Sequence, residues 1–505
     1  MRTAALLALL TVACTSGHAP APPPPANPGP TVPKQLRRLS NAELDAVASD
    51  LLGHEANLAA GMLQEPRVDG FDDDAESLLV TGPKLDDFVA VAEQVASQAS
   101  TPGCAQLDCA LDYAAQLAPR IYGRPLDAGE RERLKAVYLA GGDHPTGVQL
   151  IVEAMLLSPN ATYRTELGGP NQKYELASEL SFLITGARPD AELFAAASDG
   201  RLFDAEERVK QAERLMATPR GRLHVRDLMV SWLDLHDMEQ VAKLLANFGW
   251  FGRPVREQMR IELEHYLDDA LFGADGTLAG LFTSSRGFPG PLEALYYGQD
   301  LKGPIADFAP VELDTTRRRG VLSLPGFLAH HAAVDHTAPV QRGLFVRTRL
   351  LCMQIAPPPP NAQNNPPDPG DTTHTNREKY FEHSKSMMCY GCHRQMDPIG
   401  FGFENFDTLG RYQTTDNGFP VDATGSLDFT DVDGPFTGPA ELGTKLSQSA
   451  QVRRCFLSNM WQAAAGRAVN LPPGTEVSPS EKMTDVLLDI VRSDGFVRRE
   501  QEAQP

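Results

Sequence analysis

Apolar residues recur at helical spacing along most of this chain. Ser40-Asn41-Ala42-Glu43 has the pattern of a capping box, and Leu44, Val47 and Leu51 follow on one helical face before Gly53. This arrangement is typical of an amphipathic helix with a defined start and end. Similar amphipathic stretches predict helices over 85–98, 107–122, 127–141, 145–158, 172–186, 204–217, 221–235, 254–272, 340–352, 376–388, 439–448, 451–466 and 481–493.

One short region departs from this helical pattern. Between Tyr412 and Leu427, two short runs flank Asp416-Asn417-Gly418, whose residue types favour a tight turn between strands. The sequence therefore predicts a mainly α fold, a multi-module helical protein with a small β-hairpin near 412–427.

The first 34 residues have the pattern of an export signal followed by a tether. Arg2 precedes an apolar run, Ala4 to Leu10, that is too short to span a bilayer. Leu10-Thr11-Val12-Ala13-Cys14 resembles a bacterial lipoprotein cleavage box, in which Cys14 is lipidated, although Thr11 replaces the usual Leu and leaves ordinary cleavage near Ala19 as the alternative. The Pro-rich stretch 15–34 predicts an extended tether. We expect an exported protein of the periplasm or cell surface, most consistent with an outer-membrane lipoprotein.

Composition narrows the class of protein further. An apolar content of 42% and a charged content of 22% are ordinary for folded, soluble domains. The formal net charge of -20 argues against a nucleic-acid groove or an anionic lipid surface as partner, since both require clustered cations. After residue 14 no apolar run reaches spanning length. We therefore expect no nucleic-acid partner and membrane contact through the lipid anchor only.

Cys389-Tyr390-Gly391-Cys392-His393 spells C-x-x-C-H, the attachment pattern of haem c. Two thiols would form thioethers with the porphyrin, and the imidazole of His393 would bind the iron as its proximal ligand. A redox disulfide or reactive dithiol is one alternative, and half of a zinc site is another, although the chain has no second C-x-x-C. The sequence thus predicts one covalent haem c in a cytochrome-c-like region.

The opposite face of the iron decides between electron carriage and oxygen or peroxide chemistry. Met396 follows His393 by three residues, so it would lie on the same side of the porphyrin and pack against it. The spacing singles out no distal ligand, and the candidates are Met353, His383, Met387, Met388 and Met460.

Polar residues just beyond the motif offer supporting roles. Asp397, through its carboxylate or a backbone carbonyl, is a candidate acceptor for the ring N–H of His393, and would fix the tautomer of the ring. The alternative is that Asp397-Pro398-Ile399-Gly400 forms a simple turn. Three further charged residues could contact haem propionates, build an acid/base site or pair with each other: Glu404, Asp407 and Arg411.

Four cysteines remain once Cys14 and the motif pair are set aside. In an oxidising compartment they permit two disulfides in three connectivities. We favour Cys104 with Cys109, which are close in sequence, and Cys352 with Cys455 by elimination.

Other motifs give weaker signals. His330, His331 and His336 crowd one loop, but adjacent histidines point apart and no carboxylate stands at H-E-x-x-H spacing. Asp428, Asp431 and Asp433 lack the terminal Glu of a calcium loop, which favours a solvated acidic loop. The chain contains no G-x-G-x-x-G, Walker or G-x-S-x-G motif, so nicotinamide, nucleotide-hydrolase and serine-esterase functions have no support.

Several motifs taken together are similar to those of one family. The most specific is C-x-x-C-H-x-x-M-D-P-x-G-F over 389–401, and others are 38–44, 157–164, 175–182, Pro339-Val340-Gln341-Arg342-Gly343 and 436–442. They resemble large bacterial exported proteins assembled from domains of unknown function numbered 1587, 1595, 1592, 1588 and 1585. The resemblance implies modules at 35–60 (1587-like), 107–168 (1595-like), 172–300 (1592-like), 316–415 (1588-like, haem-binding) and 425–495 (1585-like).

The expected function is electron transfer, or the redox part of an envelope oxidoreductase, with an unidentified redox partner protein or extracellular substrate. The alternative is a surface binding or scaffold lipoprotein for polymers or partner proteins. In that case the haem would be a sensor, or the C-x-x-C a structural or redox dithiol.

Overall fold

A computed structural model describes residues 29–99, 102–302, 306–357, 368, 370–385 and 387–500, with the backbone only at 245, 247, 382–384, 387 and 388. The predicted export signal, Cys14 and most of the predicted tether lie outside the described residues. No helix in the described part of the chain combines the length and the apolar composition that a membrane span requires.

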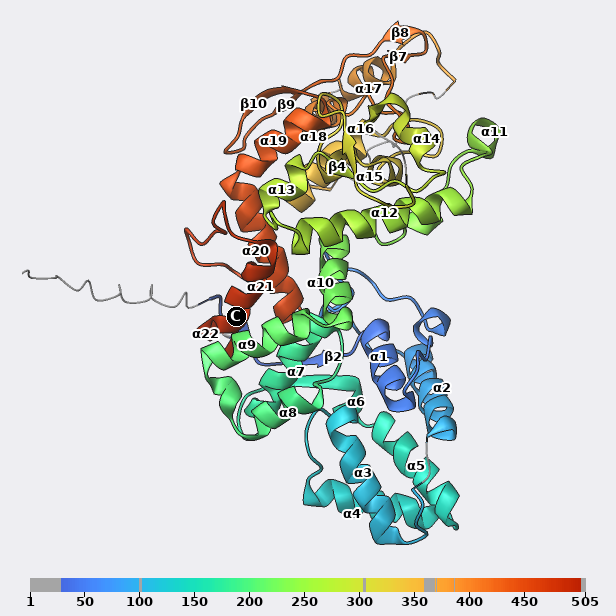
Figure 1. Cartoon of the computed structure of the whole chain (residues 1–505), viewed down its shortest axis with the longest axis vertical. Helices are drawn as coiled ribbons and strands as arrows, with labels where there is room; N and C mark the ends of the chain where they lie inside the picture. The colour runs from blue at the N-terminus through green and yellow to red at the C-terminus, as the bar shows by residue number, and fades with distance from the viewer. Residues whose placement is uncertain are drawn as a thin grey trace, which may run out of the picture.

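The chain is mainly helical, as predicted, and its first helices form the lower part of Figure 1. Ser40 caps α1 with the predicted capping box, in which Ser40 Oγ accepts from Glu43 N. Strands β2 and β3 pair antiparallel with each other. The elements are β1 (Val32–Pro33), β2 (Gln35–Arg38), α1 (Asn41–Leu52), α2 (Gly82–Gln98), α3 (Leu107–Ile121), α4 (Ala128–Ala140), α5 (His144–Leu156), α6 (Pro159–Thr162) and β3 (Tyr163–Glu166).

The middle of the molecule is a helical layer from which α10 leads upward to α12, which lies across the base of the upper part (Figure 1). Its elements are α7 (Gln172–Thr185), α8 (Ala191–Ser198), α9 (Ala205–Met216), α10 (Pro219–Trp232), α11 (Leu245–Phe248), α12 (Arg253–Phe272), α13 (Leu278–Thr283) and α14 (Ala294–Tyr297). Strand β6 (Val311–Leu313) pairs antiparallel with both β4 (Arg286–Gly287) and β5 (Leu301–Lys302).

The upper part carries the C-x-x-C-H motif, and the chain then returns downward. The elements here are α15 (Pro325–His330), α16 (Pro339–Phe345) with a π-helical extension over Val346–Leu350, α17 (Asn376–Ser384), α18 (Met387–Phe401), β7 (Thr415–Asp416), β8 (Phe419–Pro420), β9 (Thr424–Leu427), β10 (Gly434–Thr437) and α19 (Gly438–Gln448). The return leg is α20 (Ala450–Ala465), α21 (Met483–Arg492), α22 (Asp494–Val497) and β11 (Arg499–Glu500), and β11 pairs with β1 in parallel.

The predicted hairpin turn is confirmed. Strands β7 and β8 pair across Asn417 and Gly418, both at positive φ, as a primed turn requires. Leu427 belongs instead to β9, which forms a second hairpin with β10 that the sequence did not predict.

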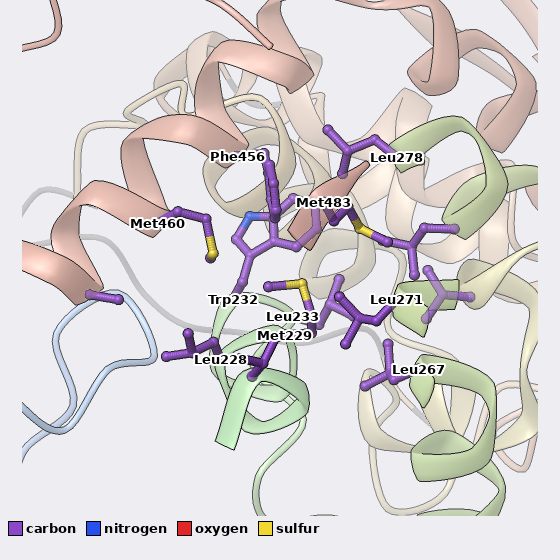
Figure 2. Close-up of a cluster of buried hydrophobic side chains, with 14 of the residues drawn as sticks. Leu228, Met229, Trp232, Leu233, Leu267, Leu271, Leu278, Phe456, Met460 and Met483 are labelled. Atoms are coloured by element: carbon purple, nitrogen blue, oxygen red, sulfur yellow. The ribbon is translucent and has the colours of Figure 1, made fainter. Parts of the chain in front are cut away.

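One hydrophobic core joins the middle, upper and returning segments. Figure 2 shows part of this core, in which Trp232 of α10 packs among side chains of α12, α20 and α21. The indole is fully buried, lies 5.0 Å from the ring centroid of Phe456, and donates from Nε1 to the carbonyl of Arg349 at 3.0 Å. The returning helices are thus packed into the same core as α10 and α12.

Both predicted disulfides are confirmed. Cys104 pairs with Cys109, and Cys352 pairs with Cys455 at a Cα separation of 5.4 Å. The second bond links the end of the π-helical extension to α20, so it fastens the motif-bearing part to the core around Trp232.

Two buried glutamates lie beside this core. Glu262 in α12 accepts from the Tyr297 hydroxyl at 2.6 Å, whereas neither carboxyl oxygen of the buried Glu293 accepts a hydrogen bond from a described residue. Burial, together with the charge of Glu262, raises the pKa of Glu293 well above its ordinary value. Glu293 is therefore the protonated member of the pair.

We expect Glu293→Gln to flatten the pH dependence of stability. The folded wild type keeps the Glu293 proton, whereas the unfolded chain releases it above its ordinary pKa of 4.5. The free energy of unfolding therefore falls as the pH rises above that value, whereas the amide of the variant does not titrate. Urea unfolding at about pH 5 and about pH 8 measures the difference. The exposed Glu213→Gln is the control. Equal pH slopes in wild type and Glu293→Gln would contradict the assignment.

Candidate functional site

Helix α18 carries the motif and is held at its C-terminal half by α16. A Cβ added at Gly400 would overlap the carbonyl oxygen of Pro339, and one at Gly343 would overlap that of Met396. The two backbones therefore approach as closely as glycine alone permits. This crossing fixes the position of α18 within the upper part.

Arg342 fastens the segment that follows α18. Its side chain is fully buried, and its guanidinium donates to the carbonyls of His331, Phe403 and Phe406 at 3.1 to 3.3 Å. Burial lowers the pKa of Arg342 to about 10. No role was predicted from the sequence for the motif Pro339-Val340-Gln341-Arg342-Gly343. In the structure Arg342 and Gly343 serve to hold α18 and the chain just after it.

The N-terminal half of α18 presents the motif at the surface. Cys392 and His393 follow Cys389 by three and four residues, so the three side chains share one face of the helix. Cys389 and Cys392 are half-buried free thiols, whereas the other described cysteines form disulfides. Because both thiols are only half-buried, the motif face lies at the surface of the protein.

Asp397 orients the ring of His393 from one turn further along α18. Its carboxylate oxygens lie 3.0 and 3.1 Å from His393 Nδ1, and the residue is 3% exposed. This hydrogen bond, the largest cause, raises the pKa of His393. It also favours the proton on Nδ1 in the neutral ring, which leaves Nε2 as the nitrogen that could bind a metal. The predicted role of Asp397 as the acceptor is confirmed. The alternative of a simple turn is wrong, because Asp397, Pro398 and Gly400 all lie within helix α18.

The surroundings of the motif fit a covalent haem. Besides the two thiols and the oriented imidazole, three large aromatic side chains in adjoining elements are more than half exposed: Phe381 in α17 at 54%, Tyr390 in α18 at 57% and Phe429 after β9 at 58%. Phe429 adjoins α18 directly, since the Arg394 guanidinium lies 5.3 Å from its ring centroid. These three side chains offer apolar surface that a bound porphyrin could cover.

The structure describes the side chains of two of the distal-ligand candidates, Met353 and Met460. The sulfur of Met353 lies 3.2 Å from Arg347 Nη1, which donates to it. Met460 is fully buried in the core of Figure 2, and Met396 is buried where α18 crosses α16. The backbones of His383, Met387 and Met388 belong to α17 and α18, and their side chains lie outside the description.

The charged residues beyond α18 are used in structural contacts. Asp407 accepts from Arg411 Nε at 2.6 Å, which confirms the pairing that was one of the expected roles. Glu404 accepts from Thr337 Oγ1 at 2.9 Å and from Asn376 Nδ2 at 3.4 Å. Burial, the largest cause, raises the pKa of Glu404 to about 7. Glu404 therefore joins the start of α17 to the loop before α16.

The three histidines before α16 do not converge and do not share one loop, because His330 is the last residue of α15. The rings of His330 and His331 are nearly perpendicular, and that of His331 packs 4.5 Å from Phe345. His336 bonds instead to Asp335 and Tyr380. Within the described ranges, no three His, Cys, Asp or Glu side chains are grouped so as to hold a metal ion. In the acidic loop, Asp431 accepts from Ser449 and Asp433 from Thr430.

The fold and the site define a class of protein: a mainly helical, multi-domain chain whose C-x-x-C-H helix is clamped by a buried Arg and two close-packed glycines. Four family models match it in order along the chain. They are PSD3 (protein of unknown function, DUF1587) over 37–101, PSD5 (DUF1595) over 109–166, PSD4 (DUF1592) over 172–298 and PSCyt3 (DUF1588) over 318–416. The chain belongs to the family built from these domains, as its motifs predicted. The matches end at residue 416, so the 1585-like module stays a prediction. No curated protein and no solved structure matches the chain.

Proposed function

We propose that this chain is an exported c-type haem protein that moves electrons at the cell envelope, as a relay or as the redox part of an oxidoreductase. Cys389 and Cys392 would hold the porphyrin by thioethers and His393 would be the proximal ligand. The observation that carries the proposal is the oriented His393 ring beside two unpaired thiols on one helix face. When bound, the haem would supply one-electron exchange.

The protein's own residues supply rigidity and orientation. Asp397 keeps the proton on Nδ1 of His393, so the imidazole presents its other nitrogen. The α16 crossing and Arg342 hold α18 against the core, and little reorganisation of the site is then expected when the charge of a bound group changes. This arrangement suits an electron-transfer site.

Export to an oxidising compartment is part of the proposal. The two disulfides support it, because such bonds persist outside the reducing cytosol. The lipoprotein pattern ending at Cys14 favours attachment to the outer membrane through lipid, with ordinary signal cleavage as the alternative.

Absorption spectra of the oxidised and reduced protein test the proposal. The protein should be purified from a host that matures haem c. We expect a haem spectrum that changes on reduction and a haem that stays with the chain after denaturation. A colourless protein from such a host would refute the assignment.

We expect Asp397→Asn to raise the reduction potential of the bound haem. The neutral amide still accepts from Nδ1 but removes the negative charge behind the imidazole, so the ligand donates less electron density to the oxidised iron. Spectroelectrochemical titration measures the potential, and Asp428→Asn is the control, since Asp428 contacts Ser426 rather than His393. An unchanged or lower potential in Asp397→Asn would show that this carboxylate does not tune the site.

The second candidate is a binding or scaffold protein in which the haem reports on binding or the dithiol is structural. A cavity of ≈ 370 Å³ beside β2, α1, α7 and α10, closed on one side by Ala463 of α20, favours it. Redox titration with and without candidate ligands separates the two functions. Substrate-dependent reduction of the haem supports the oxidoreductase, whereas binding without a spectral change supports the scaffold.

A further inference from the structure

A second cavity, of ≈ 640 Å³, lies where the first, second and third matched domains meet. Its lining comes from the ends of α1 and α3, the segment that leads from α7 into α8, and the start of α10, all below the C-x-x-C-H motif in Figure 1. Its volume is within the range of small-molecule sites, about 300–1,000 Å³. This cavity is therefore separate from the site described above and large enough for an organic ligand.

Cations outnumber carboxylates in the lining of this cavity. The charged residues there are Arg120, Arg188, Arg220, Asp50 and Asp190. Asp190 is already neutralised from outside the lining, because Arg214 donates to its two carboxylate oxygens at 2.7 and 2.9 Å. In a chain whose formal net charge is -20, this lining therefore carries a local excess of positive charge.

Arg120 and Arg220 can be reached by a ligand, since both residues are exposed. They come from different domains and contact the same aspartate. Arg220 Nη1 lies 2.9 Å from Asp50 Oδ1, and Arg120 Nη2 donates to the backbone carbonyl of Asp50. Each guanidinium carries five N–H donors, so both side chains can donate to a further acceptor in the cavity. Two such groups on one wall suit the oxygens of a carboxylate or a phosphate.

Arg188 adds a buried cation to the same wall. The residue is 6% exposed, and its Nη2 donates to the carbonyl of Ala161 at 3.0 Å rather than to a carboxylate. A buried charge without an opposite charge beside it is costly, and the field of an anion in the cavity would reduce that cost even without direct contact. Arg188 therefore favours an anionic ligand over a neutral one.

The start of α10 and several apolar side chains complete the lining. Thr218 caps α10, a helix of 14 residues, and Arg220 lies in its first turn. Because the start of a helix favours negative charge, this end adds to the attraction of an anion. Phe194 and Leu215 also line the cavity and offer apolar surface to the body of an organic molecule.

We propose that this cavity binds a small organic anion, whose carboxylate or phosphate group is held by Arg120 and Arg220 and whose body lies against Phe194 and Leu215. The site does not depend on haem attachment, so a failure to bind anions leaves the redox function standing, and a protein without haem leaves this site standing. It gives the helical domains before residue 316 a binding role of their own.

Calorimetric titration of the full-length holoprotein tests the proposal. The probes are naphthoate and naphthyl phosphate, with the neutral naphthamide as a matched body without charge and inorganic phosphate as a charge without a body. We expect saturable binding of at least one of the two organic anions, and the tighter of them identifies the head group as carboxylate or phosphate. No binding of either organic anion, or equally tight binding of naphthamide, overturns the proposal.

Three variants locate the binding in this cavity. Arg120→Gln and Arg220→Gln each remove a charged donor, and we expect about tenfold weaker binding of the anion in each. Asp50→Asn removes the carboxylate that competes for Arg220, so binding should become about threefold tighter. Exposed ion pairs contribute little to stability, and all three variants should therefore fold.

The matched controls are Arg131→Gln and Asp112→Asn. They break another exposed Arg–Asp pair, whose Nη2 and Oδ1 atoms are also 2.9 Å apart, at a place outside the cavity. We expect both controls to bind the anion as the wild type does. Unchanged affinity in both Arg120→Gln and Arg220→Gln, or weaker binding in Asp50→Asn, places the anion elsewhere and overturns the assignment.

Discussion

Replacing Cys389 and Cys392 together by Ala is expected to abolish covalent haem attachment completely. These half-buried thiols are the free cysteines of the described chain, and they lie on the same face of α18 as His393. Without them no thioether can form, and the imidazole alone leaves a haem that denaturation removes. Haem staining after denaturing electrophoresis, together with the intact mass, measures the loss. Function should be lost in parallel if the protein is an electron carrier, and retained if it is a scaffold.

The matched control is Cys104→Ala with Cys109→Ala. This pair also removes two thiols, but it breaks a disulfide in the α3 region and leaves α18 untouched. We expect this variant to keep its haem, and each single motif variant to keep the one thioether that remains. Haem that survives denaturation in the Cys389 and Cys392 double variant would refute attachment at this motif.

Gly400→Ala is expected to destabilise the protein by about 3 kcal/mol, at the upper end of overpacking effects. The added methyl group would overlap the Pro339 carbonyl oxygen, and backbone atoms cannot move aside as a flexible side chain would. Either α16 must separate from α18 or the variant unfolds more readily. Urea unfolding followed by circular dichroism measures the change in the free energy of unfolding.

Gly391→Ala supplies a control within the same helix. Nothing lies within 4 Å of a Cβ at Gly391, and Ala has the higher helix propensity, so stability should stay the same or rise by up to about 1 kcal/mol. Equal effects of the two substitutions would show that helix propensity, rather than the crossing with α16, sets the stability of α18.

Local chemistry predicted much of the helical fold. The capping box at Ser40 and the turn at Asn417-Gly418 appear as expected, because both depend on residues within one turn of each other. The helix through Pro398 was missed because proline disfavours a helix interior. Tertiary contacts override that preference here, since α16 packs along this half of α18 and Arg347 Nε donates to the Gln395 carbonyl at 2.6 Å.

The candidate site likewise has one part that the sequence predicts and another that depends on the fold. C-x-x-C-H and the Asp397 contact lie within nine residues on one helix, 389–397, so their spacing could be interpreted directly. The role of Arg342 could not be predicted from the sequence, because its acceptors lie up to 65 residues away along the chain. The cavity beside β2, α1, α7 and α10 draws Arg37, Arg164 and His224 from distant segments, and no sequence motif signals that combination.

The pairing of β1 with β11 bears on how the protein would be suspended in the envelope. Val32 lies opposite Arg499, so a leader entering at Val32 and the last strand meet at the waist of the elongated body (Figure 1). The proposed lipid anchor would then hold the molecule near its midpoint. The end that carries the C-x-x-C-H motif and the end formed by α3 to α5 would both extend away from the attachment point. Each end could then contact a different partner protein.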